Sequence, residues 1–123
     1  MSMGPLTEYR HTNEGGNFSF VCWYWNNSRA WGHEVRLMRG MDEVASARIR
    51  YYNRTWERFT FETTMLEAID NYHQSELQRY IDNYKWSHEI EKFKNGEKQQ
   101  VVEDFDKEYS YIQELRDYIK SLY

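Results

Sequence analysis

The chain has 123 residues, a net charge of −4 and a single cysteine, and 18% of its residues are aromatic. This length predicts one domain with a core built largely from rings. No apolar run approaches the length of a membrane span. One cysteine excludes an intrachain disulfide, so a cytoplasmic protein in a reducing compartment is expected.

The basic residues change type along the chain. Every cation before Lys85 is an arginine, and lysine dominates from there on, with Arg116 the one arginine left. Arginine pairs with carboxylate or phosphate through a flat fork and stacks on rings better than lysine does. Residues 1–60 carry eight arginines against six acids, whereas residues 61–123 carry eight cations against fourteen acids. The imbalance indicates a basic recognition face with an acidic helical part, or else two ordinary solvated faces.

The first 16 residues are expected to be a flexible lead-in, because they hold the only proline and three of the six glycines. A single domain over residues 17–123 should follow. Dense aromatic and β-branched runs predict three antiparallel strands at about 17–26, 32–39 and 44–53.

The turn between the last two strands is the clearest local feature. Gly40 can adopt a positive φ, as a tight hairpin requires. Alternation along the two strands then separates the faces. The predicted core face holds Val35, Leu37, Ala45, Ala47, Ile49 and Tyr51. The opposite face holds Arg36, Met38, Ser46, Arg48, Arg50 and Tyr52.

A helix is predicted at about 55–71, packed on the sheet. Its apolar residues recur at helical spacing: Trp56, Phe59, Leu66 and Ile69. The alternation of Phe59 and Phe61 also fits a strand through 58–63, and both interpretations stay open.

The C-terminal part is predicted to be an antiparallel helical hairpin. Ser75 and Gln78 form a capping-box pattern that would start a helix over about 75–94, ended by Asn95-Gly96. The second helix, about 99–122, has the strongest apolar periodicity of the chain: Val102, Phe105, Tyr109, Ile112, Leu115, Ile119 and Leu122. The predicted fold is therefore α+β, a three-stranded sheet with one packed helix and a helical hairpin.

No catalytic, cofactor or metal pattern is visible. The four histidines do not have the spacing of a zinc site, and no phosphate-cradling glycine loop is present. No nucleophile–base set or carboxylate pair stands out by spacing. A non-enzymatic protein without cofactor is expected.

Two groups of residues are candidates for binding a partner. One is a basic and aromatic strip that would read phosphate or carboxylate groups, although its arginines could instead pair with nearby glutamates across a solvated sheet face. This strip comprises Arg36, Arg48, Arg50, Tyr52, Arg54, Trp56 and Arg58. The other is an acidic face on the last helix, comprising Glu103, Asp104, Asp106 and Glu108.

Residues 47–69, with their Asn-Arg-Thr-Trp-Glu turn at 53–57, resemble a segment of small hypothetical proteins of Gram-positive bacteria, their phages and plasmids. The resemblance covers about residues 31–71. It implies a hairpin, the turn and a helix. It also implies a mobile-element setting, where small inhibitors of host defence are frequent.

Three functions follow as hypotheses. The leading one is stoichiometric inhibition of a host defence nuclease, of the anti-CRISPR kind, with the acidic face imitating nucleic-acid charge. The second is a nucleic-acid-binding accessory protein, in which the arginine strip contacts phosphates and its rings stack on bases. The third is a structural module that self-associates, for instance as a homodimer through the last helix.

Overall fold

The computed structural model describes residues 2–3, 7–51, 61–87 and 98–123. Its sheet is antiparallel and has four long strands: β2 (Thr7–Asn13), β3 (Gly16–Asn26), β4 (Trp31–Arg39) and β5 (Asp42–Tyr51). A two-residue strand, β1 (Ser2–Met3), pairs with the far end of β3 on the same edge as β2. The helices are α1 (Glu62–Ser87), α3 (Lys98–Glu108) and α4 (Tyr111–Ser121).

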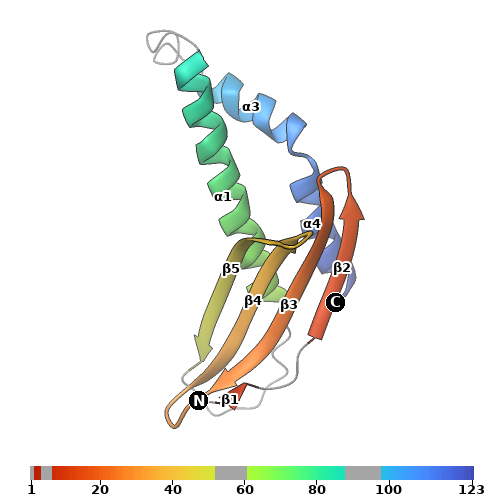
Figure 1. Ribbon diagram of the computed structural model, residues 1–123, viewed down its shortest axis with the longest axis vertical. Helices are drawn as coiled ribbons and strands as arrows, with labels where there is room; N and C mark the ends of the chain where they lie inside the picture. Colours follow the sequence, from red (N-terminus) through yellow and green to blue (C-terminus); the bar gives the residue numbers. More distant parts are fainter. Residues whose placement is uncertain (1, 4–6, 52–60, 88–97) are drawn as a thin grey trace.

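The helices α1 and α4 lie on one face of the sheet, whereas no helix of the described residues covers the other face (Figure 1). From the upper end of α1, α3 returns towards the sheet and leads into α4. The fold therefore has two layers, one of strands and one of helices.

Side-chain alternation in β3 supplies the centre of the core. Phe18, Phe20 and Cys22 point to the helical side and are buried, because successive side chains of a strand point to opposite faces. Neighbouring strands and the three helices complete the core with Val35, Leu37, Ala47, Met65, Ala68, Ile69, Tyr72, Phe105, Ile112, Leu115 and Ile119. The hydroxyls of Tyr72 and Tyr111 lie 2.9 Å apart and form a buried hydrogen bond. The polar tips of two core rings therefore satisfy each other.

The prediction of a three-stranded sheet is wrong. The missed strand, β2, lies within the segment expected to be a lead-in, and it pairs with β3 from Thr7↔Cys22 to Asn13↔Gly16. The inward-facing positions of β2 include Tyr9 and His11 rather than aliphatic residues, so the sequence pattern indicates a strand only weakly. The strand is held because Tyr9 packs against the core and His11 stacks on Tyr118 of α4, with ring centroids 4.7 Å apart.

The helix boundaries also differ from the prediction. No helix ends near Asn71 or starts at Ser75, since α1 runs without interruption from Glu62 to Ser87. The capping-box pattern has no effect there because Tyr72 and Glu76 continue the buried face of α1. Residues 55–60, where the first predicted helix begins, fall outside the described residues. The alternative of a strand through 58–63 is not found in its described part, because Glu62 and Thr63 already belong to α1.

The predicted last helix is in fact two helices, α3 and α4, separated at Tyr109 and Ser110. The break lets one apolar stripe cover two different surfaces. Phe105 of α3 packs against rings of α1, whereas α4 packs on both α1 and β2. A straight helix would point both segments in one direction (Figure 1).

The burial of the α4 stripe predicts a large effect of a charge at Ile119. We expect Ile119→Asp to lower the free energy of unfolding by several kcal/mol, because it places an unpaired carboxylate at a fully buried position. The exposed neighbour offers a control: Lys120→Asp should change stability by about 1 kcal/mol or less. Urea unfolding followed by circular dichroism measures both, and equal midpoints for Ile119→Asp and the parent would show that the stripe is not buried.

The hairpin turn predicts a purely backbone effect at Gly40. Its φ is 62°, and a Cβ at this position would contact nothing within 4 Å. Gly40→Val should therefore cost about 1–2 kcal/mol through left-handed backbone strain alone. Gly40→Asn should cost less, since asparagine tolerates this conformation. Thermal unfolding of the two variants compares them, and equal losses would contradict the explanation.

Candidate binding surfaces

The sheet face opposite the helices carries two buried indoles. Trp23 and Trp25 are only 5% and 1% exposed. Arginine side chains lie over them: the Cζ atom of Arg36 is 4.9 Å from the Trp23 ring centroid, and those of Arg48 and Arg50 are 4.2 and 5.6 Å from that of Trp25. We call this set the arginine–tryptophan face.

Strand register and one glycine make this stacking feasible. Trp25 is paired with Gly32, which in turn is paired with Arg50. A Cβ at Gly32 would lie 2.7 Å from the Trp25 ring and 2.0 Å from the carbonyl oxygen of Ile49. The missing side chain therefore gives the indole room over β4, where it can be reached from β5.

A guanidinium over an indole ring is held there by cation–π attraction. A good cation–π contact contributes about 0.5–2 kcal/mol. The guanidinium uses its flat face for stacking, while its N–H donors lie around the edge in the fork that matches carboxylate and phosphate. The arginine–tryptophan face therefore gathers guanidinium groups of the kind that bind anionic groups.

Part of this face is a cross-strand ion-pair network. The Nε of Arg36 lies 3.2 Å from Oε1 of Glu43, and its Nη2 lies 4.0 Å from Oε1 of Glu34. The Arg36 side chain is 52% exposed, so these pairs contribute little to stability. Pairing of an arginine with glutamates, the alternative interpretation of the strip, is thus seen at Arg36, which also lies over the Trp23 ring.

The structure brings three residues of the predicted strip together, namely Arg36, Arg48 and Arg50. The other four, Tyr52, Arg54, Trp56 and Arg58, lie outside the described residues. Trp23 and Trp25 were not predicted as members of this surface. The signal was available, because both alternate with the core residues Phe20 and Cys22.

The predicted acidic residues are all on α3 and are all exposed. They do not form one face, because Phe105 in their midst is buried. Asp104 and Glu108 lie one turn apart on one side of the helix, whereas Asp106 lies on another side, near His73 of α1. The structure thus presents Glu103, Asp104, Asp106 and Glu108 around an exposed helix rather than along a single stripe.

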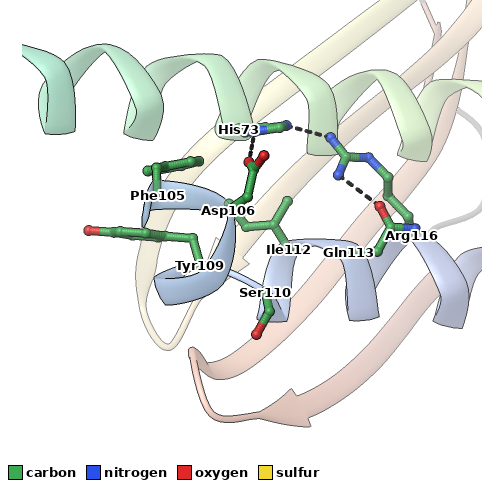
Figure 2. A pocket seen from close by; sticks show the side chains of 8 residues that line it. All are labelled: His73, Phe105, Asp106, Tyr109, Ser110, Ile112, Gln113 and Arg116. Atoms are coloured by element: carbon green, nitrogen blue, oxygen red, sulfur yellow. Dashed lines mark hydrogen bonds and ion pairs between the residues drawn. The ribbon is translucent and has the colours of Figure 1, made fainter. Parts of the chain in front are cut away.

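A polar pocket that the sequence did not predict lies where α1, α3 and α4 meet. It has a volume of about 340 Å³ and is lined by His73, Phe105, Asp106, Tyr109, Ser110, Ile112, Gln113 and Arg116 (Figure 2). His73 of α1 contacts residues of both α3 and α4. Its Nδ1 is 2.7 Å from Nη2 of Arg116, and its Nε2 is 4.0 Å from Oδ1 of Asp106.

Hydrogen bonding defines the chemistry of this pocket. A guanidinium can only donate hydrogen bonds, so the Nδ1 atom of His73 is the acceptor from Arg116. The ring proton of neutral His73 is therefore on Nε2, the nitrogen that faces Asp106. Burial, helped by the charge of Arg116, lowers the pKa of His73 against the opposing effect of Asp106 and Asp70. Arg116 also donates to Asp70 at 3.1 Å and to Gln113 at 3.3 Å. These contacts join α4 to α1, and we interpret the cluster as a structural clamp.

The only sequence signal for this clamp was Arg116 itself, a single arginine in a lysine-rich half. Its partner His73 lies 43 residues earlier in the chain. No periodicity connects the two positions, so only packing of α4 on α1 could reveal the contact.

A second histidine, His33, is buried in a ring cluster. It is 0% exposed and lies 4.6–5.6 Å, centroid to centroid, from Tyr24, Trp31, Tyr51 and Phe61. Neither ring nitrogen has a hydrogen-bond partner in the part of the chain that the structure describes. Burial lowers the pKa of His33 to about 4.

Comparison with known proteins adds no identification: no family model, no curated protein and no solved structure matches this chain. Within residues 2–3, 7–51, 61–87 and 98–123, no three potential metal ligands of the histidine, cysteine or carboxylate kind cluster together. None of the helices among those residues is long and apolar enough to cross a membrane.

Burial of neutral His33 predicts a loss of stability in mild acid. The unfolded chain binds a proton at His33 near pH 6.5, whereas the folded chain does so only near pH 4. The contribution of neutral His33 to the free energy of unfolding is therefore complete above pH 6.5 and is lost as the pH falls towards 4. The loss should reach about 3 kcal/mol.

The variant His33→Phe isolates this contribution from that of the carboxylates, which titrate in the same range. It keeps an aromatic ring, removes the proton site and avoids two unpaired nitrogens, so it should equal or exceed the parent in stability at pH 7.5. Chemical unfolding at several pH values should give a flatter profile for His33→Phe. Parallel profiles would contradict a buried, neutral His33.

Proposed function

We propose that this protein acts by stoichiometric binding to a protein partner, and that the arginine–tryptophan face is its principal contact surface. The observation that carries this proposal is the stacking of Arg36, Arg48 and Arg50 on two buried indoles. Ordering a long side chain at an interface costs about 0.5–1.5 kcal/mol, and stacking meets part of that cost before binding. Arginine and tryptophan are also enriched among the residues that dominate binding energy.

The chemistry of the face favours an acidic patch on the partner. Guanidinium edges pair with carboxylates in a bidentate manner, which gives orientation as well as attraction. Arg36 already pairs with one carboxylate oxygen of Glu34 and one of Glu43. A partner carboxylate could replace these exposed ion pairs with little loss of free energy, because exposed pairs are weak.

The partner class that we propose is a nuclease effector of host defence, with the protein as an anti-CRISPR-type inhibitor encoded by a phage or another mobile element. The small size of the chain and the resemblance of residues 47–69 support this setting. A cytoplasmic location, in keeping with the single cysteine, belongs to the same proposal.

A second surface for the same function is the acidic helical layer. The three helices carry eleven acidic and six basic residues, whereas β2–β5 carry four acidic and five basic ones. Exposed carboxylates around α3 could occupy a basic channel of a nuclease in place of nucleic acid. The acidic helical layer would bind a basic surface of the partner, whereas the arginine–tryptophan face would bind an acidic one. Variants of each surface can therefore show which of the two is the contact.

The other two hypotheses fit the geometry less well. Base stacking on Trp23 or Trp25 would require displacement of the arginines that cover them. Self-association through the last helix would need an apolar stripe that is already buried within the chain, at Ile112, Leu115 and Ile119.

A double substitution on each surface tests the proposal. Arg48→Gln with Arg50→Gln should weaken binding to a captured effector at least tenfold, as expected for desolvated interface arginines. Glu103→Gln with Asp104→Asn should leave binding unchanged if the arginine–tryptophan face is the contact. The readouts are pulldown with a panel of purified effectors and inhibition of nuclease cleavage.

Arg10→Gln provides the matched control, because Arg10 is an exposed arginine that pairs only with Glu8 among the described residues. Thermal unfolding of every variant separates lost binding from lost folding. If the acidic variant alone loses inhibition, the helical layer is the contact surface. Absence of inhibition by excess parent protein over the whole panel would refute the nuclease partner.

A further inference from the structure

The turn between β3 and β4 forms a second polar pocket, at the end of the sheet that is far from α3 (Figure 1). It has a volume of about 600 Å³ and is lined by Asn27, Ser28, Arg29, Ala30 and Arg50. Two of its five lining residues are arginines, and none is acidic. The electrostatic character of the pocket is therefore that of an anion site.

The backbone of this turn is fixed by three hydrogen bonds. The Oδ1 atom of Asn27 accepts from the N–H groups of Arg29 and Ala30 at 2.9 and 2.8 Å. The N–H of Asn27 donates to the carbonyl oxygen of Ala30 at 2.9 Å. Arg29 therefore extends from an ordered turn.

The other wall is fixed by stacking. The Cζ atom of Arg50 lies 5.6 Å from the centroid of the Trp25 ring. Trp25 itself is held over Gly32, whose register partner is Arg50. Two guanidinium groups thus approach the same pocket from separate elements, one from the turn and one from β5.

We propose that this pocket binds a phosphate monoester, with the 5′-phosphate of a nucleotide as the probe that tests it. Arg29 and Arg50 would hold the phosphate oxygens, because guanidinium forks match phosphate geometry and remain charged at every physiological pH. The hydroxyl of Ser28 and the carboxamide N–H₂ of Asn27 are further donors at the rim.

The size of the pocket favours a phosphate with an attached group over a bare ion. Ligand pockets typically have volumes of about 300–1,000 Å³, and this one lies within that range. A nucleotide could be free, or it could be the phosphorylated end of a nucleic-acid strand. In the second case Arg48, two residues from Arg50 and about 7 Å away along β5, lies where the next phosphate of the strand could follow.

This proposal does not depend on the proposed protein partner, since the two share only Arg50. Arg29 belongs to the pocket but not to the arginine–tryptophan face. The two proposals are tested separately. Loss of effector binding in the Arg48/Arg50 variant supports the protein partner, and phosphate binding by the parent supports the pocket. Arg29→Gln should affect phosphate binding and leave effector binding as it is.

Calorimetric titration of the full chain tests the pocket with four probes: inorganic phosphate, adenosine monophosphate, and a short oligothymidine with a 5′-phosphate or a 5′-hydroxyl end. We expect at least one phosphomonoester probe to bind, with at least tenfold weaker binding after Arg29→Gln and unchanged binding after Arg10→Gln. Ser28→Ala should weaken it a few-fold. Thermal unfolding confirms that each variant is folded.

The probes also distinguish the two sources of the phosphate. Equal affinity for the free nucleotide and the phosphorylated oligonucleotide indicates a single-phosphate site, whereas tighter binding of the phosphorylated oligonucleotide, relieved by salt, indicates a strand end. The proposal is overturned if neither phosphomonoester probe binds, if the 5′-hydroxyl strand binds as well as the phosphorylated one, or if Arg29→Gln binds like the parent.

Discussion

The rest of the structure depends on β3, which buries large side chains on both of its faces. On one face Phe18, Phe20 and Cys22 meet the helices, and on the other Trp23 and Trp25 are buried with no helix of the described residues above them. A two-layer fold leaves its outer sheet face to solvent. Indoles on that face need another cover, and the stacked arginines supply it.

This constraint links the architecture to the candidate surface. Arginine has both an aliphatic stem and a planar head, so it can shield an indole while it keeps a charge in water. Lysine offers a compact charge and no flat face. This difference explains why arginine rather than lysine is present at Arg36, Arg48 and Arg50. The same stacking prepares these groups for an anionic partner, so cover and recognition are two consequences of one contact.

The helical layer consists of one long helix, α1, and two shorter ones, α3 and α4, that pack against it. The break at Tyr109 and Ser110 lets α3 pack on α1 while α4 packs on both α1 and β2. At that break, Arg116 joins α4 to Asp70 and His73 of α1 through charge-assisted hydrogen bonds. His73 also stacks on Phe105 with its ring nearly parallel, at an interplanar angle of 5°. The clamp therefore fixes the angle between helices that the apolar stripe alone would leave open.

The sequence by itself determined the α+β class, the hairpin at Gly40 and the residues that share a face with Arg48, since alternation and turn chemistry are local properties. It also determined that Ile112, Leu115 and Ile119 are core. Tertiary structure alone decided that residues 7–13 form a strand, because Tyr9 and His11 gain their burial from β3 and α4. It decided that Ser75 continues a helix, since packing at Tyr72 and Glu76 outweighs a local cap. It also placed Arg50 on Trp25 and Arg116 on His73, contacts between residues far apart in the chain that no local pattern encodes.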